Sequence, residues 1–323
     1  MKIILITSWL ACSLLAASLP AAGQEPRGFP TKPVRVVSSA AGSQTDLLSR
    51  MIGSKLSDQW SQPVVIENRS GAGGALAASI VAKAAPDGYT LLFQSPQFAV
   101  NAALNEKLPY DPIKDFAGIT RVGLSTVVVV VSPGLGVKTV KEFMSLAKTR
   151  PTPIMFGSSG AGSSMHMNAE RFKFASGITA THVGFKGASE AVIEVVAGRL
   201  QYATPALTVA LPLLRDGKLT ALAVLNPQRS PTLPDVQAIV ETFPGYGRDG
   251  SYTLFAPAGT PRALLQKINK DVAQLLTLPD IKERLQRMEF DVATSTPEET
   301  DRMTRADIDT FRKVARQAGL IAK

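Results

Sequence analysis

Short apolar runs alternate with small-residue loops and amphipathic stretches in the first third of the chain. Runs at 33–37, 63–67 and 89–93 each predict a strand, and helical patterns follow the first two. Repeated strand–loop–helix units predict a parallel sheet with helices on both faces. Ligands of such sheets bind at the carboxyl ends of the strands, which makes candidates of the loops near 39–45, 70–74 and 94–101.

A second set of strands and helices follows. Residues 126–131 form an almost unbroken Val run, which predicts a strand buried on both faces. Further strands are expected near 154–156, 180–184, 202–204 and 219–225, and then at 250–256 before a helical tail. Two doubly wound α/β sets predict two lobes that face each other across a cleft. The runs near 127–131 and 253–256 are the candidate crossings between the lobes.

The loop after the first strand reads SSAAGSQTD over residues 38–46. Thr45 is the expected N-cap of the following helix, whose apolar face includes Leu48 and Ile52. Asp46 then lies in the first turn, where its negative charge suits the helix dipole. This position predicts a structural, capping role for the Asp46 carboxylate.

The stretch GSSGAGSSMH at 157–166 joins a short apolar run to a helical pattern. Backbone N–H groups at a helix start, glycines and serine hydroxyls together make a cradle for an anion such as a carboxylate. The spacing of Gly157 and Gly162 also resembles a P-loop, but Ser163 stands where a P-loop has Lys, which disfavours a nucleotide. A loop that merely caps its helix is the other interpretation.

The chain has 323 residues and a formal net charge of +9. Its Lys and Arg residues are scattered, and aromatic residues make up only 6%, so no nucleic-acid partner is expected. Lys2 is followed by an apolar stretch and then by small residues at 21–23, which predicts a signal peptide over residues 1–23 and export. The only cysteine, Cys12, lies in that segment, and a lipoprotein anchor there is the less favoured alternative.

The sequence lacks the motifs that usually mark a zinc site or a serine hydrolase. The two histidines, His166 and His182, stand in no zinc-binding pattern, and no G-x-S-x-G nucleophile motif occurs. No catalytic residue, metal site or cofactor is therefore expected. His182 is expected to be a core residue, whereas His166 could point a ring N–H into the cleft or pack and cap its helix.

Many segments in order resemble the substrate-binding proteins of tripartite tricarboxylate transporters, also called Bug receptors. The matches include residues 29–35 (FPTKPVR), 62–74 (QPVVIENRSGAGG), 84–92 (AAPDGYTLL), 108–112 (LPYDP), 114–117 (KDFA), 156–160 (FGSSG), 185–187 (FKG), 229–236 (RSPTLPDV) and 255–261 (FAPAGTP). Together they cover nearly the whole chain after the expected signal peptide.

This resemblance implies a type II periplasmic binding protein fold, with two lobes joined by two crossing strands. Lobe 1 would comprise residues 24–126 and 252–323, and lobe 2 residues 127–251. The resemblance implies a periplasmic monomer that captures a small organic acid and passes it to a two-protein membrane permease. A sensory protein that signals to a membrane kinase, and a hydrolase that uses the serine loop, are the alternatives.

The resemblance places the ligand between the loop at 38–46 and the stretch at 157–166, with the turn at 185–187 facing the same cleft. The expected ligand contacts are Ser39, Ala41, Gly42, Ser43, Gln44, Thr45, Asp46, Gln94, Ser158, Ser159, Gly160, Gly162, Ser163, Ser164, His166, Phe185, Lys186, Gly187 and Thr204.

Two departures from the family pattern bear on specificity. Ser43 and Gln44 stand where the family often has glycine, so side chains narrow the pocket or add donors. Thr204-Pro205-Ala206 replaces a common Phe-Asp-Asn and removes an acidic group that could meet a ligand ammonium. Mono- or dicarboxylates, aromatic ones included, are therefore expected to bind better than amino acids.

Overall fold

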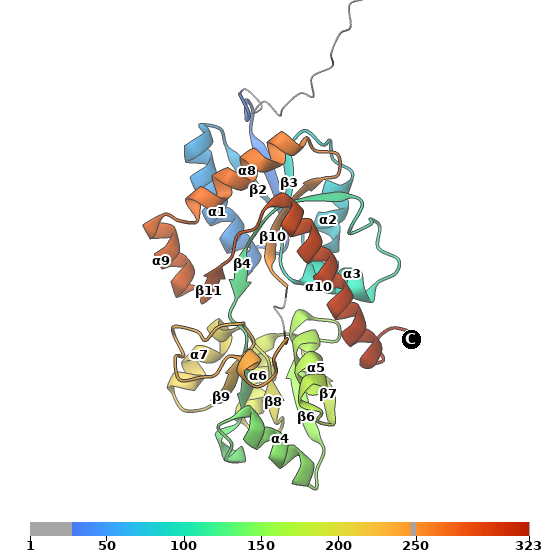
Figure 1. Cartoon of the computed structure of the whole chain (residues 1–323), viewed down its shortest axis with the longest axis vertical. Coiled ribbons are helices and arrows are strands. Elements are labelled where there is room, and N and C mark those ends of the chain that lie inside the picture. Colours follow the sequence, from blue (N-terminus) through green and yellow to red (C-terminus); the bar gives the residue numbers. More distant parts are fainter. Residues whose placement is uncertain (1–27, 247–249, 323) are drawn as a thin grey trace, which may run out of the picture.

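A computed structural model describes residues 28–246 and 250–322 (Figure 1). The expected signal peptide at 1–23 lies outside these residues. The described part forms two α/β lobes, one above the other in Figure 1, and each is built on its own sheet. Within the described ranges, no helix combines the length and the apolar character that a membrane crossing requires.

The upper sheet has six strands in the order β11–β4–β10–β3–β1–β2. Their bounds are β1 (Val34–Ser38), β2 (Val64–Asn68), β3 (Thr90–Gln94), β4 (Phe116–Ser125), β10 (Tyr252–Pro257) and β11 (Phe290–Val292). β1 pairs in parallel with β2 and β3, as expected. β10 is antiparallel to β3 and β4, because the chain leaves this lobe through β4 and returns through β10. The sheet is therefore mixed.

The lower sheet has five strands in the order β7–β6–β8–β5–β9. They are β5 (Val128–Val131), β6 (Ile154–Ser158), β7 (Ala180–Gly184), β8 (Tyr202–Ala203) and β9 (Thr220–Val224). The Val run is confirmed as a strand buried on both faces. Val128 and Val130 belong to one apolar cluster and Val129 and Val131 to another, with side chains fully excluded from solvent.

The helices pack on both faces of each sheet. They are α1 (Gln44–Trp60), α2 (Ala75–Ala82), α3 (Gln97–Leu104), α4 (Val140–Thr149), α5 (Ser164–Ser176), α6 (Ala188–Val196), α7 (Leu207–Arg215), α8 (Arg262–Leu275), α9 (Pro279–Arg287) and α10 (Pro297–Gln317). In the upper lobe α1 and α8 share a core on one face, and α2 and α3 pack on the other. In the lower lobe α4 and α5 cover one face, and α6 and α7 the other.

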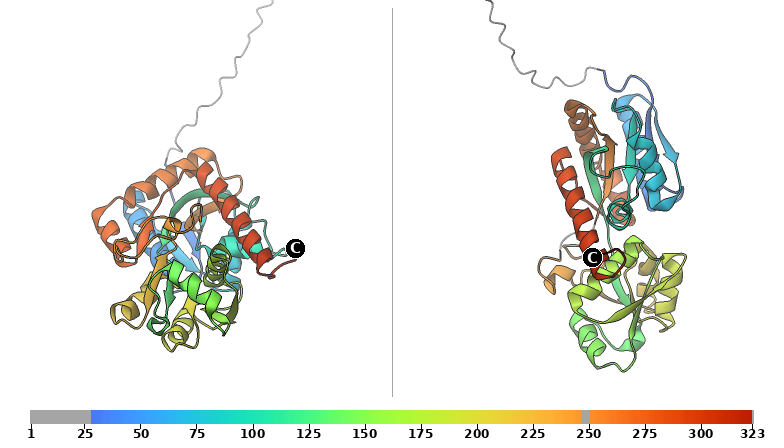
Figure 2. Two further views of the ribbon diagram at one scale, coloured as in Figure 1. Left: turned by 60° about the horizontal axis from the view of Figure 1, so that its bottom comes forward. Right: turned by 90° about the vertical axis from the view of Figure 1, so that its right-hand side faces the viewer.

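The lobes contact each other along α10 and at the first chain crossing. α10 starts in the upper lobe and runs down to the lower one (Figures 1 and 2). There an apolar cluster unites Met167 of α5 with α3 residues and with Ile308 and Phe311 of α10. At the first crossing, Thr126 donates its N–H to the Glu289 carbonyl at 2.9 Å, and Leu207 donates its N–H to the Thr126 carbonyl at 2.7 Å.

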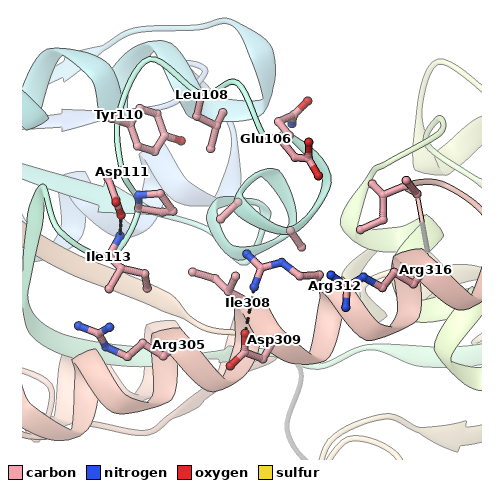
Figure 3. Close-up of a pocket in the computed structure, with 16 residues that line it drawn as sticks. Glu106, Leu108, Tyr110, Asp111, Ile113, Arg305, Ile308, Asp309, Arg312 and Arg316 are labelled. Carbon is pink, nitrogen blue, oxygen red and sulfur yellow. Dashed lines mark hydrogen bonds and ion pairs between the residues drawn. The ribbon is translucent and has the colours of Figure 1, made fainter.

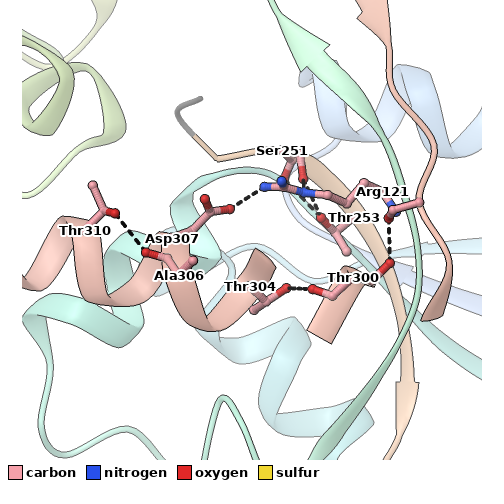
Figure 4. A network of polar contacts seen from close by, with 9 residues as sticks. Arg121, Ser251, Thr253, Thr300, Thr304, Ala306, Asp307 and Thr310 are labelled. Atoms are coloured by element: carbon pink, nitrogen blue, oxygen red, sulfur yellow. Dashed lines mark hydrogen bonds and ion pairs between the residues drawn. The ribbon is translucent and has the colours of Figure 1, made fainter. Parts of the chain in front are cut away.

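A buried polar network supports the strands next to the crossings. Arg121 of β4 donates to the Ser251 hydroxyl and to the Asp307 carboxylate of α10 (Figure 4). The Ser251 hydroxyl also lies 2.9 Å from that of Thr253 on β10. The Arg121 side chain is 5% exposed, so this ion pair sits in a poorly hydrated place and depends on its hydrogen bonds. The network ties both connecting strands to one helix.

Candidate functional site

The β1–α1 loop and the β6–α5 loop have the same local structure in the two lobes. Gly42 and Gly162 take left-handed φ angles of 73° and 72°. The next residue is in each case the helix N-cap, since Ser43 Oγ accepts from the Asp46 N–H at 3.2 Å and Ser163 Oγ from the His166 N–H at 3.1 Å. The structure thus corrects the expected cap of α1 from Thr45 to Ser43.

In the β1–α1 loop the Asp46 carboxylate holds the loop closed on itself. Oδ2 accepts the Gly42 N–H at 2.9 Å, and Oδ1 accepts from Asn68 Nδ2 at 2.8 Å and lies 2.9 Å from Arg50 Nε. Burial alone would raise the pKa of Asp46, but hydrogen bonds from Gly42, Asn68 and Arg50 outweigh it and lower the pKa. The structural role predicted for Asp46 accounts for its contacts within the chain.

In the β6–α5 loop His166 occupies the place of Asp46. Its Nδ1 accepts the Gly162 N–H at 3.1 Å, so Nδ1 carries no proton. The ring is 2% exposed and stacks on His182, with the ring centroids 3.7 Å apart. Burial, and then the neighbouring His166, lower the pKa of His182 to about 4. His166 therefore serves the loop as a hydrogen-bond acceptor inside the lower lobe.

Ser158 and His182 form a Ser–His contact, with Oγ 2.7 Å from Nε2. Ser158 is fully excluded from solvent, and its hydroxyl also lies 3.0 Å from the Gly160 carbonyl. A nucleophile must reach its substrate, and this hydroxyl faces the interior of the lobe. The contact supports the loop and gives no ground for hydrolysis.

A side chain of the upper lobe reaches the β6–α5 loop. The Gln97 carbonyl oxygen accepts from the Ser164 N–H at 2.9 Å and from the Ser164 hydroxyl at 3.0 Å. Gln97 Nε2 donates to the Gly162 carbonyl at 3.0 Å. Two donors expected to face a ligand are therefore occupied by α3 in this arrangement of the lobes.

A cavity of about 230 Å³ lies between the lobes. Gln44, Ser125 and Tyr252 line it from the upper lobe, and Ser164, Asn168 and Thr204 from the lower one. Most of the remaining wall is apolar, for example Val127, Met165 and Phe311. Three buried polar atoms in this wall, Gln44 Nε2, Ser125 Oγ and Asn168 Oδ1, lack a hydrogen-bond partner among the described residues. Buried polar groups normally have partners, so these atoms mark where a guest would bind.

The cavity gathers some of the expected contacts and leaves others outside. Gln44, Ser164 and Thr204 line it. Gln94 is 1% exposed and donates to the Gly74 carbonyl at 3.2 Å. Lys186 and Gly187 precede α6, whose first residue, Ala188, lines the cavity. The remaining expected contacts, which are Ser39, Ala41, Gly42, Ser43, Thr45, Asp46, Ser158, Ser159, Gly160, Gly162, Ser163, His166 and Phe185, belong to the two loops or to the turn before α6 and are outside this lining.

Sequence reasoning missed Tyr252, Asn168, Ser125 and Gln97. Gln97 lay within a loop already considered, but nothing in its neighbourhood indicated a reach across the cleft. Tyr252 and Gln44 are 208 residues apart in sequence and joined by a hydrogen bond. A pairing over that separation leaves no local signal.

A larger hollow of about 690 Å³ lies on the outer side of the upper lobe, between α10 and the segment after α3 (Figure 3). Arg305, Arg312 and Arg316 extend from α10 toward it, and Glu106 and Asp111 lie on the opposite side. None of the expected contacts lines it. Its charged rim and its lining, which shares no residue with the cavity between the lobes, distinguish it from the cleft.

Comparison with known proteins agrees with this geometry. Residues 48–320 match the model of the tripartite tricarboxylate transporter family receptor, TctC. The chain is 28% identical to Protein BugT of Bordetella pertussis, with 90% of each chain covered. It is 33% identical to R. palustris Rpa4515, solved with adipate, with a TM-score of 0.75 and 90% of this chain and 98% of that one covered.

A second solved structure carries a different ligand. MatC (Rpa3494) from Rhodopseudomonas palustris, with bound malate, is 31% identical, has a TM-score of 0.69, and covers 88% of this chain and 99% of its own. These neighbours confirm the expected fold class, and the matching family model describes a receptor and not an enzyme. The chain therefore belongs to the TctC family of tripartite tricarboxylate transporter receptors.

Proposed function

We propose that this chain is a periplasmic receptor that captures a small organic carboxylate, mono- or dicarboxylate, for a tripartite tricarboxylate-type permease. The ligand occupies the cleft between the β1–α1 and β6–α5 loops. The observation that carries this proposal is the cavity between the lobes, which is lined by the first residues of α1, α5 and α6.

The position of these helices favours an anion. Gln44, Ser164 and Ala188 are the first residues of α1, α5 and α6, and all three line the cavity. Helix N-termini present backbone N–H groups and a partial positive charge, so three of them around one space stabilise a carboxylate. Two similar proteins are solved with adipate and with malate, which are both carboxylates.

The expected loop residues are the proposed contacts, and Gln44, Ser164 and Thr204 have the added support of their place in the cavity wall. Thr204 has no carboxylate that could pair with a ligand ammonium, and its hydroxyl donates to the Met165 carbonyl at 2.9 Å. This supports the proposal that amino acids bind less well than plain carboxylates.

Export through a cleavable signal peptide at 1–23, a monomeric receptor and a two-protein permease complete the proposal. The proposed lobes are residues 24–126 with 252–323, and residues 127–251. The strands of the six-stranded sheet come from 34–125 and 252–292, and those of the five-stranded sheet from 128–224, which supports these bounds.

Thermal unfolding of the mature chain with added ligands tests the function. A ligand at a hundred times its dissociation constant stabilises the folded state by about 2.7 kcal/mol, which raises Tm measurably. Adipate or malate is expected to raise Tm, whereas aspartate and glutamate at the same concentration raise it less, and sodium chloride controls for ionic strength. Selective stabilisation by the amino acids would contradict the specificity, and no shift with any carboxylate would contradict the function.

A further inference from the structure

One wall of the cavity carries an oriented hydrogen-bond donor. The Tyr252 hydroxyl donates to Gln44 Oε1 at 2.9 Å, which fixes the carboxamide of Gln44. Tyr252 is 8% exposed, and its ring stacks on Phe93 and packs edge-on against Phe290. Because one end of the carboxamide is held in this way, the other end, Nε2, has a defined direction. Nε2 is buried and has no partner among the described residues.

The opposite wall carries an acceptor. Asn168 on α5 lines the same cavity from the lower lobe and is 6% exposed. Its Oδ1 is buried and also lacks a partner within the described ranges. A buried polar atom left without a hydrogen bond is energetically unfavourable, because it has lost water and gained no partner. A ligand that hydrogen-bonds to both Gln44 Nε2 and Asn168 Oδ1 gives each atom a partner and bridges the two lobes.

The chemistry of the two atoms restricts the guest. Gln44 Nε2 needs an acceptor, and Asn168 Oδ1 needs a donor. A hydroxyl or a primary carboxamide supplies both, whereas a methyl group supplies neither and an ionised carboxylate supplies no donor. The apolar residues between them, such as Met165 and Val127, fit the hydrocarbon part of such a molecule.

We propose that Gln44 is a specificity-determining residue, positioned by Tyr252, that selects a carboxylate bearing a neutral hydroxyl or carboxamide group away from its charged end. Asn168 receives the hydrogen that this group donates. This inference rests on the proposed function, because it assumes that the helix N-termini hold the carboxylate.

Titration calorimetry with matched ligands tests it. The probes are straight-chain carboxylates of four to seven carbons that end in a methyl, a hydroxyl, a carboxamide or a second carboxylate. In the wild-type protein the hydroxyl and carboxamide forms are expected to bind at least about tenfold more tightly than the methyl form of equal length, as one net hydrogen bond allows. The dicarboxylate is expected to bind more weakly than the carboxamide.

Gln44→Met keeps most of the side-chain volume and removes the donor. It is expected to weaken the hydroxyl and carboxamide forms about tenfold and to leave the methyl form within about twofold. Tyr252→Phe keeps the ring and frees the Gln44 carboxamide, so it moves the same ratio by a smaller factor. A variant that merely loosened the fold would weaken all four classes equally, and unfolding curves check that both variants fold.

The outcomes separate this inference from the function. If the wild-type protein binds no member of the series and no other carboxylate, the proposed function fails and the inference with it. If carboxylates bind but Gln44→Met changes all classes equally or none, or if the dicarboxylate binds best, the inference alone is overturned.

Discussion

The β1–α1 and β6–α5 loops have the same backbone conformation, but different side chains hold them in it. In the upper lobe the Gly42 amide is held by Asp46, an ionised carboxylate that also contacts Arg50 and Asn68. In the lower lobe the Gly162 amide is held by His166, a buried imidazole stacked on His182. The same loop conformation is thus held by an ionised carboxylate in one lobe and by an imidazole ring in the other.

This difference affects the charges and hydrogen-bond donors that surround a bound ligand. The Asp46 carboxylate is engaged by three donors of its own lobe, one of which is the positively charged Arg50. The lower loop is held in addition by Gln97 from the other lobe. The α1 N-terminus is therefore open to a carboxylate, whereas at α5 Gln97 occupies the Ser164 N–H in this arrangement of the lobes.

The largest expected effect comes from removing the ionic support of the upper loop. Asp46→Ala leaves the Gly42 amide, Asn68 and Arg50 without their acceptor, and it is expected to lower the free energy of unfolding by about 2–3 kcal/mol. Urea denaturation measures this change. Asp58→Ala, at an exposed position on the same helix, is the matched control and is expected to stay within about 0.5 kcal/mol. Equal effects of the two variants would contradict the role of Asp46.

The lower loop is expected to be more sensitive to mild acid than the upper one. The pKa of His182 is about 4 in the fold and 6.5 in the unfolded chain, so the unfolded chain binds the proton first as the pH falls. Stability is therefore lost between about pH 6.5 and pH 4, by about 1 kcal/mol once solvent screening of this half-buried ring is allowed for. The groups that face the ring are Ser158, His166, Glu170 and Lys173.

Asp46 acts in a lower window. Its lowered pKa means that its stabilising contacts are complete above its usual pKa and are lost only as the pH falls through the lowered value. Unfolding free energies measured from pH 7 to pH 4.5 for wild type and His182→Gln check the difference. The variant is expected to have the shallower dependence, and an unchanged slope would refute the assignment.

The smallest expected effect concerns the bridge from α3. Gln97→Ala removes the acceptor of Ser164 and the donor to the Gly162 carbonyl, which destabilises this arrangement of the lobes by about 1 kcal/mol. Small-angle scattering without ligand is expected to give a larger radius of gyration for the variant than for wild type. Gln59→Ala, on the outside of the upper lobe, should leave the radius unchanged. An unchanged radius in Gln97→Ala would show that the apolar cluster around Met167 suffices to hold the lobes together.

The strands and helices that could be predicted from the sequence are those with a local pattern. Apolar runs and Gly/Ser loops are local, so β1, β5, β6 and the helices after the loops were predictable, and Val128–Val131 is buried on both faces as its composition indicates. β4 was not predicted, because Thr120, Arg121 and Gly123 interrupt its apolar pattern. Arg121 is buried there only because Ser251 and Asp307 come to it from distant segments.

The site was predictable as two loops but not as a cavity. Its walls depend on pairs far apart in sequence, such as Gln44 with Tyr252 and Gln97 with Ser164. The cap of α1 was placed two residues late, because Ser43 and Thr45 are both good caps and the sequence pattern does not decide between them.

The most direct test of the central claim is a crystal structure of the mature protein with adipate. We expect the carboxylate between the lobes, with its oxygens within hydrogen-bond distance of backbone amides of the β1–α1 and β6–α5 loops. Adipate bound instead in the arginine-rimmed hollow beside α10, with an empty cleft, would contradict the account.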